Sequence, residues 1–201
     1  MEFRSSSVWR VPCFKECSLL LRRKYMKKSY LITAIAVSAA NLRAEDSGFQ
    51  ASLTPDVAIQ ARTTQIDGLA VSVWGENPQK ALALGFVNGS TRESKGFSLG
   101  LGNYADSYSG VTWALVNITE QKFVGWQNGV INYSQGTFTG FQSGCVNVAQ
   151  EFHGLQLGFV NCSENLRGVQ IGFADLALNN PLFAELPDKL APGIVFLNWS
   201  F

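Results

Sequence analysis

The chain has 201 residues, enough for one domain of ordinary size. Only 15% of these residues are charged, against about a quarter in an average soluble domain. From Glu45 onward, seven Lys or Arg stand against thirteen Asp or Glu, which gives this part a net charge of −6. Because an acidic surface repels phosphate, this charge balance argues against nucleic acid as a partner.

The segment that begins at Met26 has the pattern of a secretory signal peptide. Lys27 and Lys28 form a short positive region, residues 30–40 are apolar, and the small residue Ala44 precedes two acidic residues. We therefore expect residues 1–25 to be an over-extended start, residues 26–44 to be a signal peptide, and residues 45–201 to form a single β-repeat domain. Such a protein is exported, to the outer membrane or surface of a Gram-negative cell.

Tandem repeats dominate the chain after this segment, and they are the strongest signal in the sequence. Each unit starts with Gly and closes with Asn or Asp, as in residues 140–147 (GFQSGCVN) and 154–161 (GLQLGFVN). The closing residues recur every 14 or 15 positions: Asn88, Asn103, Asn117, Asn132, Asn147, Asn161 and Asp175.

Within a unit the side chains alternate with period two, which predicts strands. Leu155, Leu157 and Phe159 share one face, while Gln156 and Gly158 share the other. One face is therefore bulky and apolar, and the other carries glycine, glutamine and small residues. The fold class predicted from this pattern is all-β.

The first architecture that fits is an antiparallel, outer-membrane-type β-barrel of about ten short strands. The first two of these strands begin near Phe49 and Ile66. Strands of about eleven residues can cross a bilayer, with bulky side chains toward lipid and small or polar ones inside. The chain ends in alternating residues, 193–201 (GIVFLNWSF). Trp199 and Phe201 resemble the terminal signal by which outer-membrane barrels are assembled, which implies outer-membrane lipid and the barrel-assembly machinery as partners.

The alternative is a parallel β-solenoid with one coil per repeat. Its bulky apolar face would form the core, and the Asn residues would stack as a ladder at one corner. The constant phase of the repeat favours this fold, because consecutive Asn residues of an antiparallel barrel would fall at alternate rims. We take the barrel as the main prediction, since strand length, export and the terminal Phe agree with it.

Two sets of repeated polar residues are the candidate site residues, and we expect both to be structural. The closing Asn residues are expected to bond the turn backbone, with a ligand or ion at a rim as the alternative. The glutamines Gln127, Gln142, Gln156 and Gln170 form a row that would either line a narrow pore or fill the interior by bonding one another.

Nothing in the sequence indicates an enzyme, a cofactor or a metal site. His153 is the only histidine, so any catalytic triad would have to use it, and we interpret it as an exposed residue at the start of a strand. A metal site needs more ligands than the mature segment offers. Strand alternation places Cys145 and Cys162 on opposite faces, where a disulfide would be hard to close.

The repeat units, together with an SLTP opening segment, a GLAVSVWG segment and the NWSF ending, resemble bacterial surface-repeat proteins of the leptospiral type. The sequence departs from that pattern at Trp113 and Ala114, which replace the second Gly, and at Asp175, which replaces the last Asn. The resemblance implies an exported surface or outer-membrane protein of undefined activity. We expect a non-enzymatic structural or interaction protein of the outer membrane or surface. In the solenoid alternative it would be a secreted or surface-attached adhesin that binds a partner along its Gly/Gln face.

Overall fold

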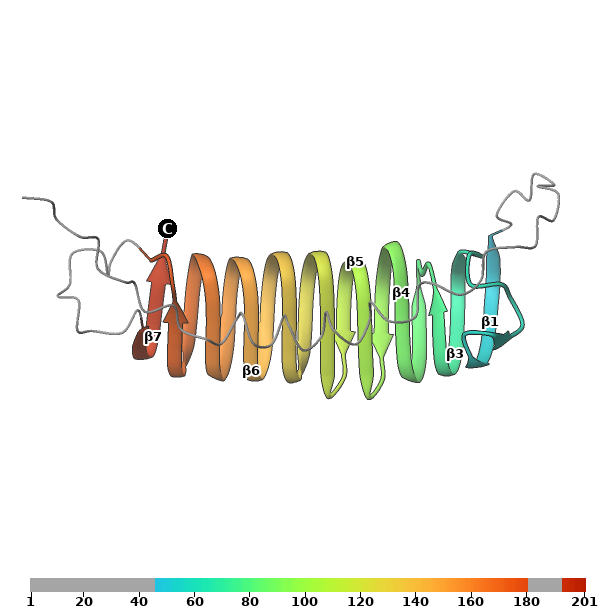
Figure 1. Ribbon diagram of the computed structural model, residues 1–201, viewed down its shortest axis with the longest axis horizontal. Coiled ribbons are helices and arrows are strands. Elements are labelled where there is room, and N and C mark those ends of the chain that lie inside the picture. The colour runs from blue at the N-terminus through green and yellow to red at the C-terminus, as the bar shows by residue number, and fades with distance from the viewer. Residues whose placement is uncertain (1–45, 181–192) are drawn as a thin grey trace, which may run out of the picture. The chain divides into compact units, whose positions relative to one another are not determined.

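The computed structural model describes residues 46–180 and 193–201, which are all-β (Figure 1). The predicted start region and signal peptide, residues 1–25 and 26–44, lie outside the described residues. One sheet joins the strands in the order β2-β1-β3-β4-β5-β6-β7. The strands are β1 (Ser47–Thr54), β2 (Val57–Ala58), β3 (Ile66–Asn77), β4 (Leu82–Leu99), β5 (Gly102–Trp113), β6 (Val116–Ala177) and β7 (Gly193–Ser200).

The fold is a parallel β-solenoid, so the barrel prediction is wrong and the alternative is confirmed. Strands β1, β3, β4, β5 and β6 pair in parallel, one after another. Equivalent repeat positions lie side by side: Gly110 pairs with Gly96 on one side and Gly125 on the other. Strand β6 winds through several coils without interruption.

The repeat fits into so short a coil because its first glycine turns a corner. Gly154 has a φ of +137°, a conformation that residues with a Cβ rarely adopt. The glycines at the same position in the other coils have φ between +118° and +143°. Because the chain bends at this glycine and continues directly as a strand, the coil closes within 14 or 15 residues without an additional connecting segment.

The inside and outside of the coil are the reverse of what the solenoid prediction assumed. The side chain of Gln156 is 0% exposed, whereas that of Phe159 is 60% exposed. The bulky face is therefore the outer surface, and the Gly/Gln face is the interior. The physical reason is in-register stacking: identical amides 14 or 15 residues apart can bond one another along the axis, and the narrow coil has no room for a bulky side chain at every inward position.

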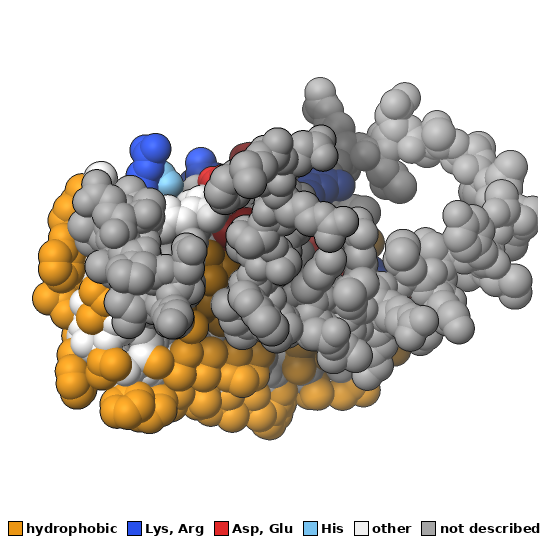
Figure 2. All heavy atoms as spheres, turned by 60° about the vertical axis from the view of Figure 1, so that its left-hand side comes forward, with side chains coloured by type: hydrophobic (Ala, Val, Ile, Leu, Met, Phe, Trp, Pro, Cys, Tyr) orange, Lys and Arg blue, Asp and Glu red, His pale blue; other side chains and the backbone are white. Residues whose placement is uncertain are grey.

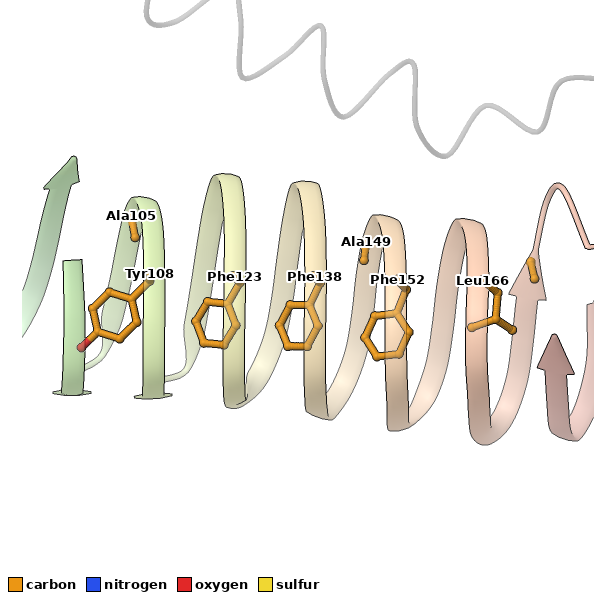
Figure 3. Close-up of a cluster of buried hydrophobic side chains, with 8 residues drawn as sticks. Ala105, Tyr108, Phe123, Phe138, Ala149, Phe152 and Leu166 are labelled. Atoms are coloured by element: carbon orange, nitrogen blue, oxygen red, sulfur yellow. The ribbon is translucent and has the colours of Figure 1, made fainter. Parts of the chain in front are cut away.

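One inward position does hold a large side chain in five successive coils (Figure 3). Tyr108, Phe123, Phe138, Phe152 and Leu166 follow one another along the axis. The ring centroids of Phe123 and Phe138 are 4.9 Å apart, and those of Phe138 and Phe152 are 5.2 Å apart, with the rings nearly parallel. This aromatic stack is the main hydrophobic core of the described residues.

Antiparallel strands cover both ends of the stack of coils. At the N-terminal end, β2 pairs with β1, and the Gln50 side chain bonds the backbone N–H and C=O of Gln60. At the C-terminal end, β7 pairs with the last coil of β6. These caps limit the unpaired strand edge that an open solenoid would present to another chain.

Candidate functional site: an uncovered apolar face

The closing asparagines form a continuous ladder inside the solenoid. Each amide Nδ2 donates to the Oδ1 of the next coil, over 2.8 Å from Asn132 to Asn147 and 2.8 Å from Asn147 to Asn161. Most of these amides also donate to a backbone carbonyl, as Asn147 does to Leu157 O over 3.0 Å. The ladder runs through Asn88, Asn103, Asn117, Asn132, Asn147, Asn161 and Asp175.

The glutamines form a second ladder. Gln142 donates to Gln127 over 2.9 Å, and Gln156 and Gln170 each donate to the preceding glutamine over 2.7 Å. Asn198 of β7 ends the row by donating to Gln170 over 2.9 Å. The four glutamines are at most 1% exposed. The interior is thus filled by amides that satisfy one another and offers no route for a pore or a partner, so the Gly/Gln face cannot be the binding surface of an adhesin.

Asp175 ends the asparagine ladder with a carboxyl where the repeat predicts an amide. It accepts a hydrogen bond from Asn161 Nδ2 over 2.7 Å, yet its buried Oδ2 has no hydrogen-bond partner. Burial raises the pKa of the Asp175 carboxyl above its ordinary 3.8, opposed by the hydrogen bonds from Asn161 and the Gly172 backbone. This carboxylate is therefore a destabilising element at the end of the asparagine ladder.

We predict that Asp175→Asn raises the free energy of unfolding at pH 7 by about 1 kcal/mol, since it removes a buried, half-satisfied charge. A carboxyl whose folded pKa is raised binds more protons when folded. The wild type should thus lose stability as the pH rises from about 3.8 through the raised pKa, and the variant should lack this slope. Urea unfolding from pH 3.5 to 7 measures both effects. Parallel pH profiles would contradict the prediction.

The predicted terminal signal lies in β7. Trp199 pairs with Val169 of the last coil, and its side chain is 42% exposed. Phe201 follows the strand and is 94% exposed. Both aromatic side chains therefore contribute to the outer surface at the C-terminal end.

Two hollows in the described part of the chain have cavity volumes of about 10 Å³ each, which is space for about one water molecule and too little for a substrate. No group of three or more His, Cys, Asp or Glu among the described residues could hold a metal ion. No helix in the described part of the chain is long and apolar enough to span a membrane.

The feature that stands out is one side of the solenoid, which we call the apolar face. It is built by the bulky outward residues between the corner glycine and the closing asparagine of successive coils. Strand register aligns them in columns, so that Leu99 lies beside Trp113 and Ile171 beside Leu197. Its exposed members include Phe49, Val71, Val73, Phe86, Leu99, Leu101, Trp113, Leu115, Trp126, Val130, Leu155, Leu157, Phe159, Ile171, Phe173, Leu197 and Trp199.

Charge is absent from this face. The segments that build it, such as 96–103, 110–117 and 154–161, contain no Lys, Arg, Asp or Glu. The charged residues of the repeats, such as Glu120, Glu151 and Arg167, fall in the other half of each coil. Figure 2 shows hydrophobic side chains gathered over one side, with Lys, Arg, His, Asp and Glu along another edge. Each coil is therefore amphipathic.

The rings on the apolar face contact one another from coil to coil. The ring centroids of Trp113 and Trp126 are 6.0 Å apart, and those of Phe159 and Phe173 are 5.0 Å apart. These stacked side chains order the face without covering it. A surface of ordered aromatic and aliphatic groups is preorganised for binding, because few side chains must be immobilised on association.

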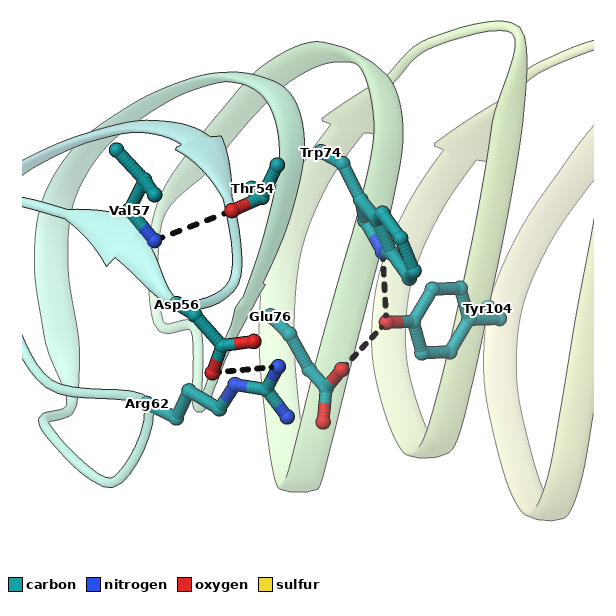
Figure 4. A network of polar contacts seen from close by, with 7 residues as sticks. All are labelled: Thr54, Asp56, Val57, Arg62, Trp74, Glu76 and Tyr104. Atoms are coloured by element: carbon teal, nitrogen blue, oxygen red, sulfur yellow. Dashed lines mark hydrogen bonds and ion pairs between the residues drawn. The ribbon is translucent and has the colours of Figure 1, made fainter. Parts of the chain in front are cut away.

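Polar contacts mark the margin of the face near its N-terminal end (Figure 4). The indole N–H of Trp74 donates to the Tyr104 hydroxyl over 3.2 Å, and this hydroxyl donates to Glu76 over 2.9 Å. The tryptophan thus presents its ring to solvent while its polar atom is satisfied. An apolar centre with a hydrogen-bonded rim is the usual composition of a protein interface.

Cys145 lies on the apolar face and is exposed, whereas Cys162 is buried, and no disulfide joins the two. The predicted placement on opposite faces is confirmed. Cys145 therefore provides a built-in probe, because it is the one exposed cysteine among the described residues and can react with a reagent while the fold is intact and the face is open.

Sequence reasoning identified the bulky residues as one face but assigned them to lipid or to the core. Trp113, Trp126 and Phe159 were therefore missed as members of a solvent-exposed apolar face. The useful signal was on the opposite face, where Phe138 and Phe152 share their side with the glutamines. A side that carries one aromatic ring and one glutamine in every coil has the composition of an interior.

No family model, curated protein or solved structure matches the chain.

Proposed function

We propose that this chain is an exported, non-enzymatic interaction protein of the bacterial surface, which acts by burying its apolar face against another surface. The observation that carries the proposal is the continuous, charge-free row of exposed side chains from Phe49 to Trp199. Monomeric soluble proteins rarely expose apolar patches above about 300–600 Å² unless the patch binds something. Residues 26–44 supply the export pattern.

The internal organisation supports a scaffold more than a catalyst. The interior amides, the aromatic stack and the corner glycines all stabilise the packing of one coil against the next. The polar half of each coil carries isolated charges, and the described residues contain only two ion pairs, Arg62–Asp56 and Lys80–Asp67. In this proposal the repeats make a rigid support, and the outward residues do the binding.

Thiol labelling in intact cells tests both location and coverage. The full chain is expressed in a Gram-negative host, and intact cells are treated with a membrane-impermeant maleimide. We expect Cys145 to be protected in the folded protein and to react after urea treatment. The matched control is Ser109→Cys in a Cys145→Ser background. This variant places a thiol at an exposed position beside the corner glycine Gly110, outside the apolar face.

The control thiol should react in intact cells without urea, which would demonstrate surface exposure. If Cys145 reacts as fast as the control thiol, the face is open in the cell and the proposed interaction is wrong. If neither thiol reacts until the cells are lysed, the proposed surface location is wrong.

A further inference from the structure

We infer that the surface buried against the apolar face is the same face of a second copy of this chain. The inference rests on the proposed function and specifies its partner: two solenoids would pack face to face as a two-fold homodimer.

The area of the face is that of a stable interface. About ten strand segments, from Phe49 to Trp199, at a spacing of about 4.8 Å give a length of about 45 Å. About six residues of each segment, at about 3.3 Å per residue, give a width of about 20 Å. The product is about 900 Å², and a specific interface buries about 800 Å² per partner.

The shape of the face suits a second copy. Its columns repeat with the strand spacing of a parallel sheet, and another copy has the same repeat. Two sheets whose faces carry bulky apolar side chains pack about 10 Å apart with those side chains interdigitated. A two-fold arrangement buries the same face of both copies at once, so the interface closes at two chains.

The charges disfavour a lipid surface as the occupant. Peripheral proteins that insert an apolar face into a membrane usually carry Lys and Arg around it, which attract anionic lipids. Here the segments of the face have no basic residue, and residues 45–201 have a net charge of −6. In a face-to-face dimer the acidic edges point away from each other and remain in solvent.

The mass of the purified protein in solution tests the inference. The full-length gene is expressed in a Gram-negative host, and the protein is purified without detergent and studied by sedimentation equilibrium at 1–50 µM. We expect twice the mass that mass spectrometry gives for one chain. Leu157→Lys combined with Phe159→Lys, at side chains 45% and 60% exposed, should weaken the dimer by about 100-fold or more.

Two further variants make the result decisive. Gln150→Lys combined with Asn165→Lys adds the same charge at exposed positions off the face and should leave the dimer intact. Phe86→Lys combined with Leu101→Lys places the charges in other coils and should dissociate the dimer if the first pair fails to fold, as judged by circular dichroism.

Three outcomes would overturn the inference: a monomeric wild type, an assembly larger than two chains, or a dimer that survives both face variants in folded form. A monomer that binds phosphatidylcholine vesicles would assign the face to lipid. Protection of Cys145 in cells combined with a monomer in solution would contradict the dimer and leave the proposed function standing. Free reaction of Cys145 in cells would contradict the proposed function itself.

Discussion

Replacing Asn147 with alanine is expected to lower the free energy of unfolding by roughly 3–5 kcal/mol. Asn147 lies in the middle of the asparagine ladder and is 0% exposed. Its amide donates to Asn161 Oδ1 over 2.8 Å and to Leu157 O over 3.0 Å, and its own Oδ1 accepts from Asn132 over 2.8 Å. Alanine removes all of these hydrogen bonds and leaves their partners buried.

The size of the effect follows from the partners that remain. A buried donor or acceptor that loses its partner costs about 1–3 kcal/mol, whereas an average hydrogen bond contributes only about 1 kcal/mol net. One substitution leaves buried groups without a partner in both adjacent coils: Asn132 on one side, and Leu157 and Asn161 on the other. The loss should therefore exceed that of a typical point mutation, which is near 1 kcal/mol.

Urea unfolding followed by circular dichroism measures this loss. The matched control is Asn165→Ala, since Asn165 is an exposed asparagine of the polar half-coil whose side chain accepts a hydrogen bond from Asn179. We expect the control to change stability by less than about 0.5 kcal/mol. Equal effects of the two substitutions would mean that the ladder contributes little to the stability of the coils.

Hydrogen exchange should show where the damage lies. The free energy of unfolding of a solenoid is approximately the sum of the intrinsic stabilities of its repeats and the interface energies between neighbouring repeats. Exchange should therefore accelerate most around residues 132–161 in the Asn147→Ala chain, and the coils nearer β1 should keep their protection. A uniform loss of protection would indicate that the solenoid unfolds as one unit.

The sequence predicted the all-β class, the repeat spacing and the separation of side chains into two faces. Alternation is a local property, so residues such as Leu157 and Gln156 could be assigned to opposite faces without knowledge of the fold. Whether neighbouring units run parallel or antiparallel is a long-range property, and strand length and a terminal Phe are consistent with both. The phase of the asparagines was the one signal that distinguished them, and it pointed to the solenoid.

The reversal of inside and outside could not be predicted from hydrophobicity. Burying Leu, Phe and Val is favourable in most folds. In this coil the interior amides gain bonds from their equivalents above and below, and the corner and inner glycines hold the backbone close to the neighbouring coil. Gln156 is therefore buried at little cost, and the bulky side chains remain outside for a second surface to cover.

Replacing Gly154 with alanine is expected to destabilise the solenoid by roughly 3 kcal/mol or more. At its φ of +137°, an ordinary side chain costs of order 1–3 kcal/mol in backbone strain. The added Cβ would also overlap sterically with the backbone carbonyl oxygen of Gly140, far inside the van der Waals contact distance. Because that oxygen belongs to the main chain, no change of rotamer can relieve the contact.

The clash must instead move one coil away from the other. This movement would also disturb the glutamine ladder and the aromatic stack. Gly140, Gly154 and Gly168 stack in the same way, each against the carbonyl of the preceding corner. A displacement at Gly154 lengthens the bond from Gln156 to Gln142, now 2.7 Å, and opens the aromatic stack at Phe152.

Gly102→Ala is the matched control, because a Cβ at Gly102 would meet no atom within 4 Å. Alanine there should be neutral or slightly stabilising, since it restricts the unfolded chain. Urea unfolding of both variants measures the difference. If Gly154→Ala proves as stable as Gly102→Ala, the corner glycines are not required for the close spacing of the coils. Some other feature must then bring the amides of the two ladders within hydrogen-bonding distance.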